Sequence, residues 1–559
     1  MTEQVLDYEK MIDDKMLLFD KYLERTNMDK KDYQYEGVRW CLRNEIQPLE
    51  KVDPNLLIQP LEKIDPNLLI QPFPKVEQKE EKEDHFAPLF PKVDKVDFAP
   101  LFQKVDKVVF APLFQKVDKV DRGGFIADEM GLGKTIMMIG TMICNYVKRT
   151  LIVLPPILID QWFLQIYRTT GHKALIYHGA HKKKITLDML MRATIVITTY
   201  GAVTIKKKDL LLVKDSPDLL PLLHKVAWSR IIFDEAHHLR NANTCWKSVK
   251  LLRADIRWLV SGTPIQNSKR DFYNLCSILN LPASFYKKSE NLPLLSKLYI
   301  LKRTKKQVGI MIPDAVIDKN IVDWKNKREK DLSEEIHSAL EFSKVSFKGE
   351  NNVLVRMLGD KGVLQLLLRA RQSCILPKLL APVVEKMIEL GLIDKHIDNY
   401  KEALQCSSKL DMVIGKILED KDNGNGKIVF CHFREEIDTI TRRLREGGID
   451  RIAIFDGRFK NRDILNDKYD VLILQIQTGC EGLNLQENYS EIYFVSPHWN
   501  PAVEEQAIAR CHRIGQKKIV VVNRFEMGNF IKETKNVDNY VCHVQDLKKK
   551  IASAIMSDK

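Results

Sequence analysis

The sequence predicts an α/β protein with two parallel-sheet lobes, helical insertions between them and a short repeat insertion in the first lobe. Three observations predict this class. A strand, glycine loop and helix pattern runs from Phe125 to Ile139, and two further apolar runs end in polar residues at Asp234 and Ser261. A later region, from Lys427 onward, has its own alternation of strand and helix patterns. We expect ligand-binding residues where these strands end, because α/β sheets bind ligands at the carboxyl ends of their strands.

Length and composition agree with a large globular protein. The chain has 559 residues, 45% of them hydrophobic, which suggests about three or four domain-sized units. A net charge of +13 favours a polyanionic partner such as nucleic acid. Ten scattered cysteines form no Cys-x-x-Cys pair, and the longest apolar run is too short to cross a bilayer. We therefore expect a soluble intracellular protein without zinc fingers, disulfides or a membrane segment.

An array of near-identical repeats interrupts the first lobe over residues 48–121. PLEKVDPNLLIQ from Pro48 is followed by PLEKIDPNLLIQ, and three FAPLF units start at Phe86, Phe98 and Phe110, all with a period of twelve. A proline in every unit prevents a long helix. Near-identity indicates recent duplication, so we expect an insertion that the catalytic fold does not require. Its apolar residues leave two forms open: a stack of short turns or strands, or a docking surface for a partner.

A glycine-rich loop, DEMGLGKT, predicts a nucleotide site. It has Asp128 where the strict phosphate-loop pattern has glycine, and Gly133, Lys134 and Thr135 at the expected places. The glycines let backbone N–H groups surround phosphate oxygens, the lysine reaches the terminal phosphates, and the threonine hydroxyl binds Mg²⁺. The alternative is a flexible glycine turn with a chance Gly-Lys-Thr. The expected nucleotide-binding residues of this loop are Asp128, Glu129, Met130, Gly131, Leu132, Gly133, Lys134 and Thr135.

An acidic pair, Asp234-Glu235, follows the buried-strand pattern Ile231-Ile232-Phe233. Asp234 is suited to hold Mg²⁺, directly or through water, and Glu235 to orient and deprotonate the attacking water. Alone, Asp-Glu-Ala-His could begin a solvated helix. The phosphate loop that precedes it in the chain favours the catalytic interpretation.

Later motifs add candidate groups for phosphoryl transfer. A polar turn, SGTPIQN from Ser261 to Asn267, follows another apolar run and could sense the γ-phosphate. In the second lobe, QAIARCHRIGQ places Arg510 and Arg513 at i and i+3, which predicts one face of a helix. Two guanidinium groups suit the charge that develops on a transferring phosphoryl group. A surface salt-bridge face is the alternative.

The segments DEMGLGKT, DEAH, SGTPIQN, GLNL and HWNPAVEEQAIARCHRIGQ resemble, in order, the signatures of Swi/Snf-related DNA-dependent ATPases of helicase superfamily two. The resemblance implies two RecA-like lobes with ATP and Mg²⁺ in the cleft between them and duplex DNA across both. That family also has aspartate where the strict pattern has glycine. The segment PHWNPAVEEQAI is similar to the corresponding segment of the repair and transcription-termination subgroup. No cysteine-rich RING module is present, so ubiquitin-ligase activity is not implied.

The resemblance also implies roles for single residues. Gln34 would read the adenine, Glu235 would be the general base, and Gln266 would couple the nucleotide state to lobe closure. Arg510 and Arg513 would be arginine fingers delivered from the second lobe. DNA contacts would be made to the phosphate backbone, because a motor that moves along DNA must not depend on sequence. The candidate DNA-binding residues are Thr199, Tyr200, His432, Phe433, Thr478, Gly479, Trp499 and Asn500.

The expected organisation follows from these motifs. We expect an N-terminal segment that starts the first lobe, the repeats, the ATP-binding lobe, a helical region, the C-terminal helicase lobe and a tail, at 1–47, 48–121, 122–285, 286–405, 406–530 and 531–559. The expected function is ATP-dependent translocation on double-stranded DNA that remodels or displaces DNA-bound proteins such as nucleosomes or a polymerase. A strand-separating helicase or RNA-directed ATPase is one alternative, and a non-enzymatic nucleic-acid-binding scaffold another. The protein would be nuclear in a eukaryote and otherwise cytoplasmic or viral, and a monomer is expected.

Overall fold

A computed structural model describes residues 2–46, 122–212, 219–263, 268–341, 346–347, 362–392, 397–458, 467–476, 483–530 and 535–556. The repeat insertion predicted at 48–121 lies outside these residues. The chain divides into two compact units, the first from Met1 to Gly309 with Ile555–Lys559 and the second from Ile310 to Ala554. Each unit is built on its own sheet.

The first unit contains a seven-stranded sheet in the order β3-β4-β2-β5-β6-β1-β7, and every pairing in it is parallel. Its strands are β1 (Arg122–Ile126), β2 (Thr150–Leu154), β3 (Leu175–Tyr177), β4 (Ile195–Thr199), β5 (Ala227–Asp234), β6 (Arg253–Val260) and β7 (Ile300–Leu301). Strands β2 and β4 are buried along their whole length, since helices cover both faces of the sheet. This burial explains the continuous apolar runs of the sequence.

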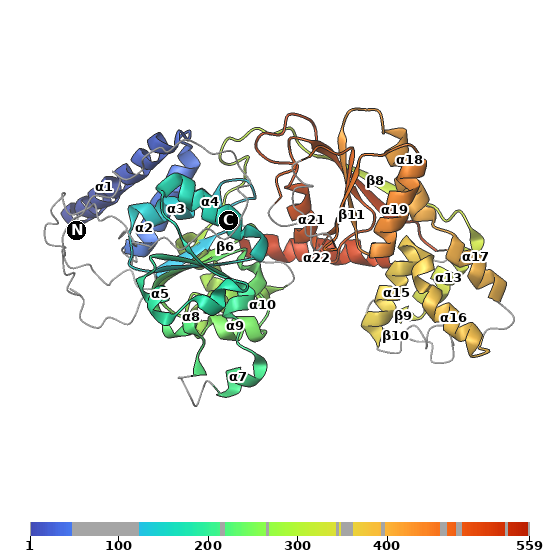
Figure 1. Cartoon of the computed structure of the whole chain (residues 1–559), viewed down its shortest axis with the longest axis horizontal. Coiled ribbons are helices and arrows are strands. Elements are labelled where there is room, and N and C mark those ends of the chain that lie inside the picture. The colour runs from blue at the N-terminus through green and yellow to red at the C-terminus, as the bar shows by residue number, and fades with distance from the viewer. Residues whose placement is uncertain are drawn as a thin grey trace. The chain divides into compact units, whose positions relative to one another are not determined.

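Helices of the first unit pack on both faces of this sheet. The α-helices are α1 (Thr2–Thr26), α2 (Asp32–Ile46), α3 (Lys134–Cys144), α4 (Ile159–Thr170), α5 (Leu187–Arg192), α6 (Tyr200–Val203), α7 (Lys207–Leu212), α8 (Leu222–Lys225), α9 (Thr244–Val249), α10 (Lys269–Ile278), α11 (Ala283–Tyr286) and α12 (Leu292–Tyr299). Helices α1 to α4 share one hydrophobic core with the sheet, whereas α9 and α10 lie over the opposite face (Figure 1). There Phe272 of α10 packs on Phe125 of β1, with 5.7 Å between the ring centroids.

The second unit contains a six-stranded parallel sheet in the order β12-β13-β11-β14-β15-β8. Its strands are β8 (Val316–Val322), β11 (Gly426–Cys431), β12 (Ile452–Phe455), β13 (Val471–Gln475), β14 (Tyr489–Phe494) and β15 (Val521–Met527). A separate antiparallel pair joins β9 (Leu340–Glu341) to β10 (Ser346–Phe347). Two parallel sheets with covering helices confirm the predicted fold class.

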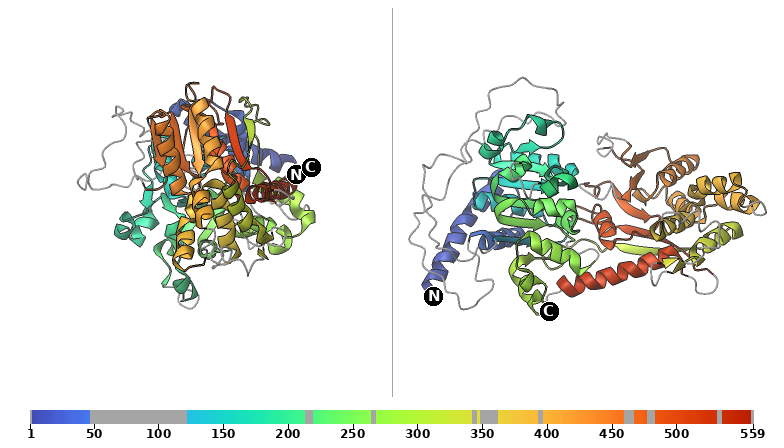
Figure 2. Two further views of the ribbon diagram at one scale, coloured as in Figure 1. Left: turned by 90° about the vertical axis from the view of Figure 1, so that its right-hand side faces the viewer. Right: turned by 90° about the horizontal axis from the view of Figure 1, so that it is seen from below.

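Helices of the second unit form two groups. They are α13 (Lys327–Ser338), α15 (Val363–Ile375), α16 (Ala381–Glu389), α17 (Ile397–Gln405), α18 (Ser408–Glu419), α19 (Arg434–Glu446), α21 (Pro501–Ile508) and α22 (Val537–Met556). Helices α18 and α19 cover one face of the sheet and α21 lies on the other (Figure 1). Helices α13, α15, α16 and α17 gather beside one another, as the yellow and orange ribbons of Figure 2 show.

The region 286–405, expected to be helical, contributes residues to both compact units. Residues 286–309 belong to the first unit, because β7 pairs with β1 through Ile126 and Leu301. Residues 310–405 belong to the second unit, because β8 pairs with β15 over its whole length. The helical region is therefore shared between the two units, and the functional roles given to the six segments stay predictions.

A buried ion pair anchors helix α2 to the first sheet. Glu45 is 1% exposed and accepts hydrogen bonds from the Arg230 guanidinium, from Trp258 Nε1 at 2.7 Å and from Asn145 Nδ2 at 2.8 Å. Arg230 lies on β5 and Trp258 on β6, so a single carboxylate joins α2 to two strands and to the end of α3. This anchor fixes the helix that carries Gln34.

Replacement of Glu45 by alanine is expected to destabilise the first unit by about 3 to 5 kcal/mol, because Arg230 would stay buried without its counter-charge. Urea unfolding of the full chain measures the loss. Asp188→Ala is the matched control, since the Asp188–Arg192 pair is 66% and 77% exposed and should contribute about 0.5 kcal/mol or less. If both variants lose the same free energy of unfolding, the buried pair does not have the structural role expected of it.

Candidate functional site

The phosphate loop has the expected strand–loop–helix form. Strand β1 ends at Ile126 and α3 begins at Lys134. Gly131 and Gly133 have φ angles of 92° and 77°, a region that side chains with a Cβ avoid. A Cβ on Gly133 would also lie 2.2 Å from Gln34 Nε2. The backbone conformation therefore favours glycine at 133, and the Gln34 amide would have to shift to admit a Cβ there.

The first turn of α3 carries Lys134 and Thr135, which are predicted to bind phosphate and Mg²⁺. Lys134 Nζ donates to the carbonyl oxygens of Asp128 at 2.9 Å and Glu129 at 3.3 Å, so the ammonium group lies inside the curve of the loop. Thr135 follows in the first turn and is half-buried. The backbone N–H groups of a helix's first turn lack partners within the helix, which makes this end favourable for anions.

Gln34 lies directly against this loop. Its side chain is 8% exposed, and Nε2 donates to Leu132 O at 3.3 Å. The helix that carries it is distant in sequence but contacts α3 and β1. The structure thus brings the expected adenine-reading residue to the phosphate loop.

The acidic pair stands at the end of β5. Asp234 is buried, and its Oδ2 accepts a hydrogen bond from Trp162 Nε1 at 2.6 Å while its Oδ1 accepts one from Glu235 N at 3.0 Å. Burial, together with the neighbouring charge of Glu235, raises the pKa of Asp234 to about 7. Trp162 of α4 therefore orients one oxygen of the carboxylate expected to hold Mg²⁺.

Glu235 has an unusual backbone conformation. Its φ of 50° is left-handed, which costs a residue with a side chain on the order of 1 kcal/mol. The following short 3₁₀-helix (Ala236–Leu239) brings His237 Nδ1 to 3.2 Å from Glu235 Oε2. Such strain persists only where the surrounding structure imposes it, and strained residues cluster at functional sites. The general-base role of Glu235 stays a prediction.

The Ser261-Gly262-Thr263 turn joins the phosphate loop to the acidic pair. Ser261 N donates to Ile126 O at 3.0 Å, and Ser261 Oγ lies 3.4 Å from His237 Nδ1. A Cβ on Gly262 would lie 3.1 Å from Met130 Cγ of the phosphate loop. Three motifs distant in sequence thus meet at one edge of the sheet. Gln266 lies outside the described residues.

Two candidate DNA-binding residues of the first unit, Thr199 and Tyr200, have side chains that form hydrogen bonds within the unit. Thr199 Oγ1 caps α6 by accepting from Ala202 N at 3.3 Å, and Tyr200 Oη donates to Asp234 O at 2.7 Å. Both residues are buried, at 2% and 8% exposed. Tyr200 therefore links this segment to the acidic pair, and its contact with DNA stays a prediction.

The second unit brings two candidate DNA-binding residues, His432 and Trp499, together beside Arg371. The Arg371 Nη2 atom lies 3.2 Å from His432 Nε2, and its guanidinium carbon lies 6.0 Å from the centre of the Trp499 ring. Glu436 accepts from the backbone N–H groups of His432 and Phe433, both at 2.9 Å. Burial raises the pKa of Glu436 to about 7.

Asn500 caps α21, with Oδ1 accepting from Ala502 N at 3.2 Å. Lys548 of α22 donates to Trp499 O at 2.6 Å, so the C-terminal helix holds the same loop. Thr478 and Gly479 lie outside the described residues. DNA binding by these residues stays a prediction.

The prediction that Arg510 and Arg513 lie on one face of a helix is wrong. Helix α21 ends at Ile508, and the arginines lie in the turns that follow. Gln516 Nε2 donates to carbonyl oxygens of this turn and its neighbours at 2.9, 3.0 and 3.3 Å, and Gly515 adopts a φ of 95°. These interactions favour a compact turn over a further helical turn.

The two arginines are nevertheless neighbours. Burial, and secondly the charge of Arg510, lowers the pKa of Arg513. The Arg513 guanidinium also donates to Asn484 Oδ1 from the GLNL segment. Two positive groups are thus gathered in one turn, although by a different local structure from the one expected.

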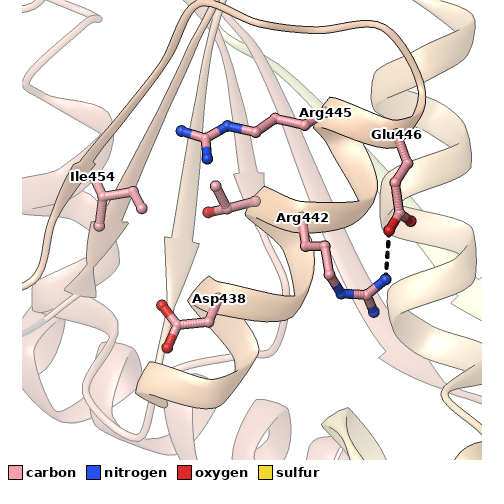
Figure 3. Close-up of a pocket in the computed structure, with 6 residues that line it drawn as sticks. Asp438, Arg442, Arg445, Glu446 and Ile454 are labelled. Atoms are coloured by element: carbon pink, nitrogen blue, oxygen red, sulfur yellow. Dashed lines mark hydrogen bonds and ion pairs between the residues drawn. The ribbon is translucent and has the colours of Figure 1, made fainter.

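A shallow hollow lies elsewhere on the second unit, between α19 and β12. Arg442 donates to Glu446 at 2.7 Å, and Arg445 lies on the same helix (Figure 3). Asp438 is paired with Arg458 at 2.7 Å. Both acidic residues are therefore neutralised, and the hollow contains none of the predicted site residues.

Three residues of the site were missed by sequence reasoning: Trp162, Arg303 and Arg371. Trp162 stands in an amphipathic helix, where nothing distinguishes it from a core residue. Arg303 and Arg371 contact Asp128 and His432, which are distant along the chain, and the sequence alone shows no partner for either side chain.

Comparison with protein families decides the class of the chain. Residues 33–446 match the model of the SNF2-related domain, and residues 408–515 match the helicase conserved C-terminal domain. The chain belongs to the SNF2-related family. This confirms the predicted family and agrees with the expected enzyme class, a helicase-family hydrolase that uses ATP.

Relatives of this SNF2-related chain carry helicase and repair names. It is 27% identical over 459 residues to an uncharacterized ATP-dependent helicase, MG018, of Mycoplasma genitalium, covering 77% of this chain and 40% of that protein. It is 27% identical over 490 residues to the human DNA excision repair protein ERCC-6-like, covering 72% and 37%. The chain thus spans about two fifths of the length of these relatives.

A solved structure, the Sulfolobus solfataricus SWI2/SNF2 ATPase core in complex with dsDNA, is 22% identical to the SNF2-related chain. The match covers 78% of this chain and 89% of the chain in the solved structure, with a TM-score of 0.31. Within the described part of this chain, no helix is long and apolar enough to cross a membrane.

Proposed function

We propose that the chain is an ATP-dependent translocase on double-stranded DNA that remodels or displaces DNA-bound proteins. The observation that carries this proposal is the meeting of the phosphate loop, the Asp234-Glu235 pair and Gln34 at one edge of the first sheet. The described residues of this unit that are predicted to bind ATP and to activate water lie there. The family and the names of the relatives support the same chemistry.

The residues of the first unit fit a nucleotide with Mg²⁺. The left-handed glycines leave room for phosphate oxygens beside the start of α3. The Thr135 hydroxyl and the Asp234 carboxylate are oxygen ligands of the kind Mg²⁺ prefers. When bound, Mg²⁺ would neutralise charge that develops on the phosphates. Lys134 would turn from the loop carbonyls to the terminal phosphates.

Glu235 would take the proton from the attacking water. His237 Nδ1 lies 3.2 Å from Glu235 Oε2 and, if protonated, would pair with the carboxylate; Ser261 Oγ lies 3.4 Å from the same ring nitrogen. Hydrolysis at the loop would therefore be sensed by the Ser261 turn and by Gln266 beyond it. Arg510 and Arg513 would stabilise the charge on the transferring phosphoryl group.

The DNA would be held through its phosphates. The chain carries a net charge of +13, and phosphate contacts by basic and polar groups do not depend on base sequence. In the second unit, His432 and Trp499 lie beside Arg371, and Phe433 and Asn500 are their neighbours in sequence; these residues would grip the DNA backbone. The proposed displaced proteins are nucleosomes or a polymerase. The protein would act in the nucleus of a eukaryote, and otherwise in the cytoplasm or on viral DNA.

Nucleic-acid dependence of ATP turnover tests this function. Duplex DNA is expected to raise the hydrolysis rate, with single-stranded DNA and RNA raising it less, because the proposed grip follows a duplex. The chain should also displace a triplex-forming strand from duplex DNA without separating the duplex itself. Lys134→Ala is the control, since it removes the phosphate-binding ammonium group.

Two outcomes would favour other functions. Stimulation by RNA, or separation of duplex strands, would indicate a helicase or an RNA-directed ATPase. Nucleic-acid binding without any hydrolysis would indicate a scaffold.

A further inference from the structure

A short basic segment runs beside the phosphate loop. Strand β7 pairs in parallel with the end of β1, and the alignment continues past the strands: Ala127 N donates to Leu301 O at 2.7 Å and Glu129 N to Arg303 O at 2.9 Å. Residues 300–305 therefore form a wall along the start of the loop. This neighbourhood is fixed by backbone hydrogen bonds.

Each carboxylate at the start of the loop is neutralised by a cation of this wall. The Asp128 side chain is 0% exposed and accepts from Arg303 at three donors: the backbone N at 2.9 Å, Nε at 3.2 Å and Nη2 at 2.6 Å. Glu129 pairs with Lys305 Nζ at 2.7 Å. Without these cations, two uncompensated negative charges would lie in the loop that is expected to hold the triphosphate.

Arg303 also contacts the start of the helix that carries Gln34. Its Nη1 donates to the carbonyl oxygen of Tyr33, and its guanidinium carbon lies 6.0 Å from the centre of the Tyr33 ring. A Cβ on Gly37, one turn along α2, would lie 2.9 Å from Arg303 Nη2. One planar guanidinium thus joins the loop, through Asp128, to the backbone next to Gln34.

We propose that Arg303 is a positioning residue that couples recognition of the nucleotide base by Gln34 to the shape of the phosphate loop. Asp128 stands where the strict pattern has glycine because its carboxylate is the anchor for this guanidinium. The proposal rests on the ATP site of the proposed function. Arg303 does not touch the nucleotide; it fixes the distance between the base-reading residue and the loop.

Nucleotide selectivity tests the coupling. Isothermal titration of the full chain with ATP and with GTP is expected to show about 10- to 100-fold weaker ATP binding in Arg303→Met, the loss of a charge-assisted contact. The preference for ATP over GTP should narrow as well, because the start of α2 is no longer held in register. Lys306→Met is the matched control: it removes an exposed charge three residues further on and should bind as the wild type does.

Second variants separate the two parts of the role. Adding Asp128→Asn to Arg303→Met should recover part of the affinity, because no uncompensated carboxylate remains, but not the selectivity. Arg303→Lys keeps the charge without the planar fork, so it should keep affinity better than selectivity. It also serves if Arg303→Met fails to fold.

A folded Arg303 variant with wild-type affinity and wild-type ATP preference would overturn the proposal, whatever its thermal stability. Failure of the proposed function gives a different result. In that case neither nucleotide binds the wild-type chain, or Lys134→Ala binds ATP as well as the wild type does.

Discussion

Replacement of Glu235 by glutamine is expected to lower the rate of ATP hydrolysis by about 10²- to 10⁴-fold while ATP continues to bind. Glutamine has the same size and can occupy the same left-handed position, but its amide cannot accept the proton of the attacking water. The charge of Glu235 is also the second cause of the raised pKa of Asp234. Its removal should therefore leave Asp234 more readily ionised and the expected Mg²⁺ ligand intact.

Single-turnover hydrolysis with saturating ATP measures the chemical step, and calorimetric titration measures binding. Glu446→Gln is a matched control, because Glu446 is an exposed carboxylate of α19 whose partner is the exposed Arg442. It should hydrolyse ATP at the wild-type rate. Undiminished turnover by a folded Glu235→Gln chain would mean that another group deprotonates the water.

Much of the first lobe could be predicted because buried parallel strands have a clear sequence pattern. Phe125-Ile126, Ile231-Ile232-Phe233 and Trp258-Leu259-Val260 are continuous apolar runs, and they lie in β1, β5 and β6. Each is followed by polar residues that the sheet brings to one edge. The positions of Lys134, Asp234 and Ser261 therefore follow from local patterns and one topological rule.

The clamp on Asp128 could not be predicted in this way. Arg303 is 175 residues from Asp128, and the two meet only because β7 adds to the sheet beside β1. β7 is two residues long, too short to give a strand pattern. No periodicity in the sequence indicates which residue neutralises a buried carboxylate so distant along the chain.

The turn at Arg510 and Arg513 shows a different limit. Spacing of i and i+3 suits a helix, and α21 does run up to Ile508. Beyond the helix, Gln516 bonds to two carbonyl groups of the 486–489 stretch and to that of Cys511, and Gly515 takes a left-handed conformation. Interactions of a side chain with distant backbone decided the local structure, so helical spacing was a poor guide.

Replacement of Arg513 by alanine is expected to lower the rate of ATP hydrolysis by about 10³- to 10⁵-fold, the range for removal of an arginine finger. Arg510→Ala should act in the same direction, because the two positive groups lie in one turn. ATP binding should change little in either variant, since both arginines belong to the second unit and would act on charge that develops during the reaction. Stopped-flow measurement of phosphate release with duplex DNA present follows the rate.

Arg513→Lys separates charge from geometry. A lysine keeps the positive charge but cannot present two parallel N–H donors, so it should recover only a small part of the rate. Arg442→Ala is the control, because Arg442 is 62% exposed, lies on α19 and is paired with Glu446; it should turn over ATP as the wild type does. If Arg513→Ala loses hydrolysis only because the chain unfolds at the assay temperature, the role of Arg513 is its structural bond to Asn484. If folded Arg510→Ala and Arg513→Ala chains hydrolyse ATP at the wild-type rate, these two arginines of the second unit take no part in the reaction.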